Sequence, residues 1–444
     1  MTTPIDDHDA LLAEPSTPAE PADRAASATA PVDEDGERRP FRKRRPKTFV
    51  ALVVVMVLLV PLTISYVRAL AAPGSESFEA RTVGWLRDIK LGFVVDRLEQ
   101  EYYERDQFAD GGTPTVGIAP AVASPTTATT ATTVATTAAP PGSVATTSTT
   151  IATTTTALPP HTPPPVRVAS PAAEPLPQEG EWFPVGPQVQ GRSGVYVTKV
   201  RPNAQKSSLL VFVGWADPKL TEIKLFPGTN LPGGQWSTPS SLSPDYCSRA
   251  IMASNGGFRM DQSRGGYYDE GYEMFPLRDG AASLIFFQDG SIDVAEWGRD
   301  YTHADLPRIR SVRQNLELMA DGGAPAPRLD HNDWGALLAN TAFVWRSGYG
   351  VTADGALVFA AGPALTPGDL VRTLLNAGAV RVMQGDINPD WTVANLYSVD
   401  ANGTCAGTSG LPGSSDQGGF RSGGWRYLSV DSRDFVAVLA KPTP

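Results

Sequence analysis

Twenty consecutive residues without a charged side chain, Thr48–Val67, divide the chain into two parts that meet different environments. An α-helix rises about 1.5 Å per residue, so a helix of this length is about 30 Å long. That length matches the hydrocarbon core of a lipid bilayer. We therefore predict one transmembrane helix at residues 48–67, with an aqueous segment on either side.

The residues before this helix are strongly basic. Arg38–Lys47 carries seven cationic side chains in ten positions, and such flanks stay on the cytoplasmic side. Residues 1–47 are otherwise rich in Pro, Ala, Asp and Glu, so we expect a disordered cytoplasmic tail. Everything after Arg68 is expected to be extracytoplasmic. A cleaved signal peptide ending near residues 69–71 is the alternative, and it exports the same part of the chain.

Two segments separate this helix from the apolar C-terminal part. Residues 68–110 are expected to be a helical juxtamembrane segment, because apolar side chains of Arg81–Tyr103 recur at helical spacing until Gly92 interrupts them. Residues 111–180 are expected to be a stalk. Within them, Gly111–Val166 contains no Asp, Glu, Lys or Arg and is dominated by Thr, Ala and Pro, which cannot bury a core. Gly111–Val166 would span about 170 Å as polyproline II or about 40 Å as a coil.

After residue 181, apolar runs alternate with Gly-rich turns, so we assign residues 181–444 to one exported domain. Strands are predicted at residues 195–200, 209–216 and 434–440, and hairpins at residues 284–297 and 351–362. The expected class is α+β, with a mixed, mostly antiparallel sheet and few helices. The formal net charge of −10 argues against nucleic acid as a partner.

One helix is well marked in this domain. Thr366 is its expected N-cap and Pro367 its first residue. Asp369, the third residue of the helix, completes a capping box with Thr366, and Gly378 ends the helix. A strand before it and the strand AVRVM after it form a strand–helix–strand unit. If the two strands are parallel, Asp386 emerges beyond the carboxyl end of the second strand, where α/β sheets place ligand-binding side chains.

Asp386 is followed by Asn388 and Asp390, a spacing that is typical of the start of a calcium loop. The sixth position is Trp391 and the twelfth is Tyr397, so the EF-hand pattern is excluded. Another form of calcium binding stays open, as does a plain solvated turn in which these side chains cap the backbone. We expect no other cofactor and no metal.

The chain has two cysteines, Cys247 and Cys405, both in the exported part. An exported pair is typical of a disulfide, and two free buried thiols are the alternative. A zinc site is not expected, because the four histidines show no ligand spacing.

Several stretches place glycine beside polar or aromatic residues: SNGGF at residues 254–258, RQN at residues 313–315 and WRSGYG at residues 345–350. Adjacent glycines let the backbone approach a ligand closely, arginine binds phosphate, and aromatic faces stack on sugar rings. Each stretch alone is also compatible with a turn in a β-rich domain. Together they favour a pocket for a phosphorylated carbohydrate.

These residues resemble the phosphodiester glycosidase family, the group of the uncovering enzyme that removes N-acetylglucosamine from a phosphodiester. The resemblance covers about residues 195–439 and rests on SNGGF, on Arg346-Ser347-Gly348 with VTADGALVF, and on the helix–strand unit that ends in the aspartate motif. The family typically reads Asn-Leu-Asp-Gly-Gly at this strand end. Here Gln384–Asn388 reads Gln-Gly-Asp-Ile-Asn, which is similar to a wall-associated, actinobacterial-type branch.

The resemblance implies an enzyme that hydrolyses a glycosyl phosphodiester of the cell envelope. It assigns Asp386 as the carboxylate at the anomeric carbon and Arg346 as the phosphate clamp. Substrate contacts are expected from six further residues: Asn255, Gly256, Gly257, Arg313, Asn315 and Asn388. The expected location is the cell membrane, with a single pass and the domain outside. The alternative is a module of the same fold that binds or scaffolds wall glycan without catalysis.

Overall fold

The computed structural model describes residues 46–72, 78–103, 108–120, 161–327, 329, 343–400, 402–411 and 423–442. The chain divides into two units, Met1–Leu62 and Thr63–Pro444. The expected cytoplasmic tail up to residue 45 and most of the expected stalk, residues 121–160, lie outside the described residues.

The predicted apolar span is helical. Helix α1 covers Pro46–Leu70, and its segment Phe49–Leu70 is long and apolar enough to cross a membrane, a criterion that a signal sequence also meets. The predicted juxtamembrane segment contains two helices, α2 (Phe78–Asp88) and α3 (Gly92–Tyr103), which contact one another. The break between them covers residues 89–91, and α3 begins at Gly92, the residue at which the sequence predicted an interruption.

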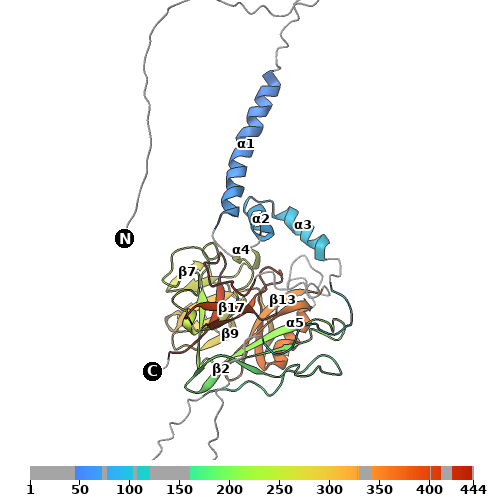
Figure 1. Ribbon diagram of the computed structural model, residues 1–444. Coiled ribbons are helices and arrows are strands. Elements are labelled where there is room, and N and C mark those ends of the chain that lie inside the picture. Colours follow the sequence, from blue (N-terminus) through green and yellow to red (C-terminus); the bar gives the residue numbers. More distant parts are fainter. Residues whose placement is uncertain are drawn as a thin grey trace, which may run out of the picture. The chain divides into compact units, whose positions relative to one another are not determined.

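The described residues of the second unit form three sheets (Figure 1). The eight-stranded sheet has the order β1 (Phe183–Val189), β2 (Arg192–Val200), β3 (Val211–Ala216), β14 (Leu357–Leu365), β13 (Val344–Thr352), β15 (Ala379–Gln384), β11 (Leu318–Asp321), β12 (Ala324–Pro325). One five-stranded sheet has the order β7 (Tyr272–Phe275), β6 (Tyr267–Asp269), β10 (Ile309–Gln314), β8 (Ala282–Phe287), β9 (Ile292–Glu296). The other has the order β17 (Cys405–Ser409), β16 (Ala394–Val399), β5 (Ala250–Asn255), β18 (Phe435–Ala440), β4 (Thr221–Phe226).

Neighbouring strands pair antiparallel throughout the described part of these sheets, so the predicted α+β class with mostly antiparallel strands is confirmed. Both predicted hairpins are present: β8 turns into β9 around Asp289–Gly290, and β13 turns into β14 around Asp354–Gly355. The described residues also include the short helix α4 (Met260–Ser263) and two 3₁₀ turns, Cys247–Arg249 and His303–Arg308.

Helix α5 (Pro367–Asn376) carries the predicted caps. The Thr366 hydroxyl accepts a hydrogen bond from the Asp369 N–H, and the Asp369 carboxylate accepts one from the Thr366 N–H. Gly378 follows with φ +95°, a conformation that favours glycine. Because β13 lies between β14 and β15 and is antiparallel to both, β14 and β15 run parallel. Asp386 therefore lies just beyond the carboxyl end of β15, the second of two parallel strands joined by α5, as the sequence predicted.

The hydrophobic core lies between the sheets and under the helix. Its largest cluster joins side chains from each sheet, including Phe212, Met252 and Leu284. A second cluster packs Leu370 and Leu374 of α5 on the eight-stranded sheet. This arrangement brings the ends of strands from all three sheets to one place.

The domain extends beyond the boundary predicted at residue 181. In the segment His161–Gly180, the Thr162 N–H donates to Asp217 Oδ2 over 2.6 Å, and the fully buried Glu179 binds Arg201. Phe108 and Ile118 belong to the main core cluster. Both segments thus pack with the folded domain, whereas the sequence predicted a juxtamembrane segment up to residue 110 and a stalk at residues 111–180.

Candidate functional site

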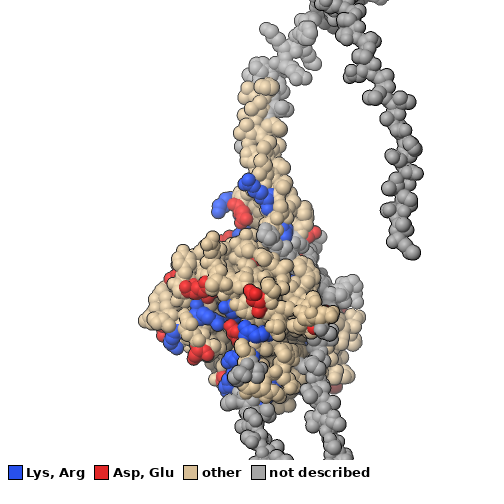
Figure 2. Space-filling model, turned by 60° about the vertical axis from the view of Figure 1, so that its left-hand side comes forward, with Lys and Arg blue, Asp and Glu red and all other residues tan. Residues whose placement is uncertain are grey.

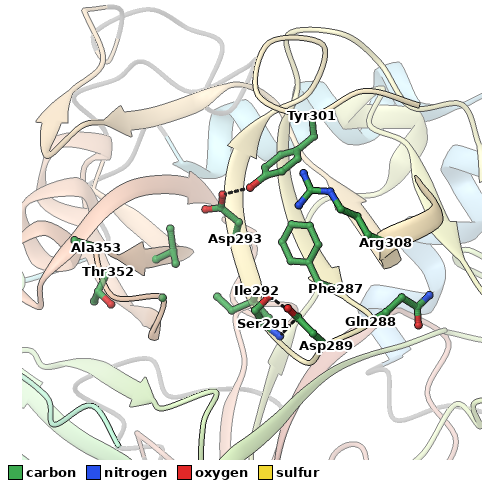
Figure 3. Close-up of a pocket in the computed structure, with 12 residues that line it drawn as sticks. Phe287, Gln288, Asp289, Ser291, Ile292, Asp293, Tyr301, Arg308, Thr352 and Ala353 are labelled. Atoms are coloured by element: carbon green, nitrogen blue, oxygen red, sulfur yellow. Dashed lines mark hydrogen bonds between the residues drawn. The ribbon is translucent and has the colours of Figure 1, made fainter. Parts of the chain in front are cut away.

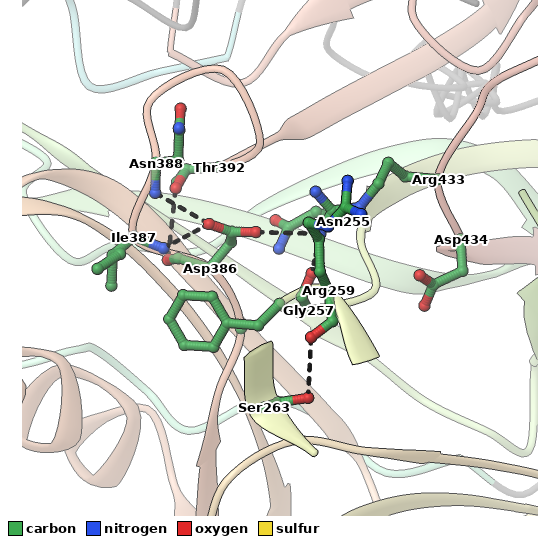
Figure 4. Close-up of polar contacts among 12 residues, drawn as sticks. Asn255, Gly257, Arg259, Ser263, Asp386, Ile387, Asn388, Thr392, Arg433 and Asp434 are labelled. Carbon is green, nitrogen blue, oxygen red and sulfur yellow. Dashed lines mark hydrogen bonds and ion pairs between the residues drawn. The ribbon is translucent and has the colours of Figure 1, made fainter. Parts of the chain in front are cut away.

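The ends of four strands and the middle of a fifth converge on Asp386, and Figure 4 shows Asp386 with Asn255, Arg433 and Asp434. Asp386 follows β15, Asn255 is the last residue of β5, and Asn315 follows β10. Arg433 and Asp434 directly precede β18. Ser347 lies within β13, next to the end of β15. Each of these residues is buried.

The Asp386 carboxylate is held by its own backbone on one side. Its Oδ1 accepts hydrogen bonds from the N–H groups of Ile387 (2.8 Å) and Asn388 (2.9 Å). Ser347 fixes the backbone of the same residue, because its Oγ accepts from the Asp386 N–H at 2.8 Å. This bonding explains why the chain turns sharply after β15.

The other carboxylate oxygen faces a guanidinium. Arg433 Nη2 lies 3.4 Å from Asp386 Oδ2 and also donates to the Gly257 carbonyl at 2.7 Å. The Arg433 guanidinium lies 4.3 Å from the centre of the Trp391 ring, and Arg426 lies 4.5 Å from the same ring. Trp391 is half-buried. One part of its side chain is thus exposed to solvent, while its ring lies against Arg433 of the ion pair.

Burial raises the pKa of Asp386 above its ordinary value, while Arg433, the two N–H groups and Arg313 act in the opposite direction. Burial also lowers the pKa of Arg433, against the effect of Asp386 and Asp434. A carboxylate with a raised pKa among cationic side chains is a frequent feature of functional sites.

Asn255 joins β5 to the eight-stranded sheet. Its Nδ2 donates to Ser347 Oγ at 3.0 Å, and its Oδ1 accepts from the Val393 N–H at 3.2 Å. Its carbonyl accepts from the hydroxyl of Tyr349, which also contacts Ser254 Oγ. Asn255 therefore holds Ser347, and through it Asp386, in a fixed position.

The glycine pair after Asn255 is required for close packing. A Cβ on Gly256 would lie 2.0 Å from Asp434 Oδ2, and the Gly256 N–H donates to the Asp434 carbonyl. The N–H group of Gly256, which the resemblance implies as a substrate contact, therefore binds Asp434 within the protein. Arg313 Nε binds Asp434 Oδ2 at 2.7 Å in a buried ion pair, and Arg313 Nη2 donates to the Phe258 carbonyl. Asp434 thus holds both the glycine turn and Arg313.

Asn315 completes the same cluster. Its Nδ2 donates to the carbonyls of Gln384 (2.6 Å) and Gly385 (2.7 Å), the two residues before Asp386. Its Oδ1 and Asp434 Oδ1 are buried acceptors without a hydrogen-bond donor in the described part of the structure. Two such acceptors beside a carboxylate favour a ligand that donates hydrogen bonds, such as a sugar hydroxyl.

Arg346 is placed differently from the expectation. Its Nε donates to the Leu365 carbonyl at 2.8 Å and its Nη1 to Gln384 Oε1 at 3.3 Å. Burial lowers its pKa, and the opposing charge is Asp369 of α5. Neighbouring residues of a strand point to opposite faces, so Ser347 faces Asn255 while Arg346 faces α5. The guanidinium that meets Asp386 is that of Arg433.

Asn388 caps the turn, because its Oδ1 accepts from the Asp390 N–H at 2.9 Å. The oxygens of Asp386 and Asn388 thus accept from backbone N–H groups, and the remaining Asp386 oxygen faces Arg433. A calcium ion bound to Asp386 Oδ2 would lie beside the positively charged Arg433 guanidinium. The arrangement therefore does not fit calcium. The described residues hold no group of three or more His, Cys, Asp or Glu side chains suited to a metal.

Arg433, Asp434 and Trp391 were not predicted as site residues. Arg433 and Asp434 form a charged pair directly before the apolar strand β18, and a charged pair at the start of a buried strand is a signal that the sequence does contain. The predicted disulfide is present: Cys247 and Cys405 are bonded and join the start of β5 to β17.

A separate cavity of about 470 Å³ lies between the β8–β9 turn and the β13–β14 turn (Figure 3). It contains none of the predicted site residues. Asp293 in it accepts from the Tyr301 hydroxyl at 2.8 Å and from Arg381 at 3.1 Å, while Asp289 Oδ1 accepts from Ser291. Its carboxylates are thus engaged by neighbouring donors. On the face seen in Figure 2, acidic and basic side chains lie interspersed.

Comparison with protein-family models gives no match, and comparison with curated proteins gives none either. The solved structures that are similar to the chain include the following three. The catalytic domain of zebrafish N-acetylglucosamine-1-phosphodiester alpha-N-acetylglucosaminidase, auto-inhibited by its pro-peptide, is 11% identical with a TM-score of 0.38, over 62% of this chain and 87% of that one. A hypothetical protein from Synechocystis is 12% identical with a TM-score of 0.28, over 58% and 64%. A putative exported protein from Burkholderia pseudomallei is 9% identical with a TM-score of 0.25, over 54% and 76%. These values are too low to transfer a function to this chain.

Proposed function

We propose that the protein is a membrane-anchored hydrolase that cleaves glycosyl phosphodiesters outside the cytoplasmic membrane, with Asp386 as its catalytic carboxylate. The observation that carries the proposal is the environment of this side chain. Asp386 is buried, bound by two N–H groups on one oxygen, and faces Arg433 with the other.

The reaction breaks the bond between the anomeric carbon and the phosphate oxygen, and water supplies the hydroxyl group that the sugar receives. The leaving group is a phosphate monoester, a stable anion, so a strong general acid is less necessary. Positive charge develops at the anomeric carbon in the transition state, and a carboxylate nearby stabilises it or activates the water. Asp386 takes this role in the proposal.

Arg433 takes the role of the phosphate-binding group, in place of Arg346. A guanidinium has five N–H donors, so one arginine can contact both a carboxylate and a phosphate oxygen. Arg433 is fixed by Asp386, Gly257 and Trp391 before any substrate binds. Asn315 Oδ1 and Asp434 Oδ1 are the acceptors that we assign to sugar hydroxyls.

A binding module without catalysis is the second candidate. It is favoured by the Asp386 Oδ1 contacts to the next two N–H groups, which are those of a turn cap. Turnover separates the two functions. The full-length protein in detergent is incubated with a panel of sugar-1-phosphodiesters, and the released reducing sugar and phosphate monoester are measured. Equal amounts of both products support the hydrolase. Saturable binding of these compounds without either product supports the binding module.

A further inference from the structure

Residues 121–160, the central part of the Thr/Ala/Pro tract, are bounded on both sides by residues that are docked on the same domain. Before them, Phe108–Pro120 forms a segment that we call the strap. After them, His161 contacts Arg192 at 2.9 Å and Thr162 contacts Lys219 at 3.0 Å and Asp217. A stalk would have only its C-terminal end on the domain.

The strap is held by two buried lysines. Lys206 has no exposed side-chain surface; its Nζ donates to the Phe108 carbonyl at 2.6 Å and lies 2.7 Å from Asp110 Oδ1. Lys199 is also buried and donates to the Gly117 carbonyl at 2.8 Å. A buried ammonium group is stable only when it is paired or hydrogen-bonded. The strap therefore supplies partners that the folded domain requires.

Backbone and apolar contacts add to these bonds. The Gly111 N–H donates to the Gln205 carbonyl at 2.8 Å, and Ser207 Oγ donates to the Gly112 carbonyl at 2.9 Å. Phe108 and Ile118 are about nine-tenths buried in the main core cluster. From Phe108 to Ile118 the strap thus makes contacts with buried lysines, with the backbone and with the apolar core. Such contacts over eleven residues are typical of an integral part of a fold.

We propose that the strap is the point at which the domain is tethered, so that residues 121–160 connect two points on the domain and do not separate it from the membrane. Both docking points lie on β2, at Lys199 and at Arg192. Residues seven apart in a strand are about 23 Å apart. Forty residues can span that distance several times over.

The tether between α1 and the strap is consequently short. Helices α2 and α3 contribute about 35 Å at 1.5 Å per residue, and the other residues between Leu70 and Phe108 add at most about 50 Å at full extension. If α1 is the proposed membrane anchor, the strap lies within about 85 Å of the bilayer, and the site is farther from the bilayer than the strap by no more than the extent of the domain itself. A substrate held at or near the membrane surface is then within its reach, and one deep in an outer wall layer is not.

Controlled cleavage of the full-length chain tests the tether. One variant carries a protease recognition sequence after residue 140, and a second carries it between Tyr103 and Phe108. The two cysteines both lie after residue 140, so the disulfide cannot join the fragments of the first variant. After complete cleavage in detergent, an N-terminal affinity tag is used to recover the fragments. We expect the C-terminal fragment to be retained after cleavage at 140 and released after cleavage before the strap. Release of the fragment in both variants overturns the proposal.

A variant of a lysine that binds the strap tests the contact itself. Lys206→Met keeps the length and apolar character of the side chain and removes the ammonium group. Hydrogen bonds to charged groups contribute about 1.5–3 kcal/mol, so the fragment cut at 140 should dissociate at least about tenfold faster. Asp110→Asn, on the exposed side of the contact, should act in the same direction with a smaller effect. Unchanged dissociation in Lys206→Met contradicts the role of this lysine. Because the readout is fragment retention, it is independent of the proposed activity and of the membrane.

Discussion

Arg433 Nη2 lies 3.4 Å from Asp386 Oδ2, and their side chains are 9% and 4% exposed. The two residues are far apart in the sequence, and the eight-stranded sheet and the β5–β18 sheet bring them together. The charged state of Asp386 depends on this contact, because burial opposes it and Arg433 favours it.

The first prediction concerns pH. The proposed mechanism needs Asp386 to be ionised, and its pKa is raised by burial, so activity should fall with decreasing pH before an ordinary aspartate is protonated. Arg433→Met removes a charge that lowers this pKa. The acidic limb of the kcat/KM profile should therefore move to higher pH in the variant. A limb that stays in place, in a variant that is still active, contradicts the coupling.

Arg346→Met should affect folding and spare catalysis. The variant loses donors to the Leu365 carbonyl and Gln384 Oε1, and unmade buried hydrogen bonds of this kind cost about 1–3 kcal/mol each. We expect a lower melting temperature and an unchanged kcat/KM for the folded fraction. A large loss of kcat at an unchanged melting temperature would return Arg346 to the mechanism.

The local elements of this domain could be predicted from the sequence. Helix α5 has its cap, Pro367 and Gly378 within thirteen residues, and both hairpins turn at an Asp-Gly pair. The position of Asp386 just after β15 could be predicted because the signal for the strand–helix–strand unit is also local. These features depend on neighbours in sequence, which is why they are visible without a structure.

The partners of Asp386 could not be found in this way. Arg433 reaches it through the pairing of β18 with β5, and Ser347 through the pairing of β13 with β15. That Arg346 faces α5 and not Asp386 depends on the strand alternation at the start of β13, which cannot be read from composition. The docking of the strap on the domain, which the composition does not indicate, has a similar cause: its buried partners, Lys199 and Lys206, lie some ninety residues later.

The disulfide should make a large contribution to stability. Cys247 and Cys405 are 158 residues apart, and closing a loop of this size stabilises the fold by about 4–5 kcal/mol in the chain-entropy model. The double variant Cys247→Ser/Cys405→Ser should melt at a lower temperature than the wild type, and a reductant should lower only the wild-type value. Equal melting temperatures in oxidised and reduced wild type would contradict this expectation.

The basic run Arg38–Lys47 predicts the orientation of α1. Protease added to intact cells should digest the C-terminal domain, or release it by cutting between α1 and the strap, and should leave an N-terminal epitope protected. Protection of the domain contradicts the proposed export. Loss of the N-terminal tail from the mature protein, with the domain still outside, identifies a cleaved signal peptide.

Asp386→Asn separates a catalytic carboxylate from a turn cap. The amide oxygen can still accept from the Ile387 and Asn388 N–H groups, so the turn is kept, while the charge opposite Arg433 is lost. Asp390→Asn is the matched control, because it makes the same chemical change two residues beyond the turn cap Asn388. Melting temperatures of both variants show how much of any effect is unfolding.

The most direct measurement is kcat/KM of wild type, Asp386→Asn and Asp390→Asn on one glycosyl phosphodiester that the wild type hydrolyses. Preorganised electrostatic groups contribute about 2.7–4 kcal/mol to the transition state. The account predicts a loss of about 100- to 1,000-fold for Asp386→Asn in folded protein, and a loss of less than about tenfold, or about 1.4 kcal/mol, for Asp390→Asn. Equal activity of wild type and Asp386→Asn contradicts it.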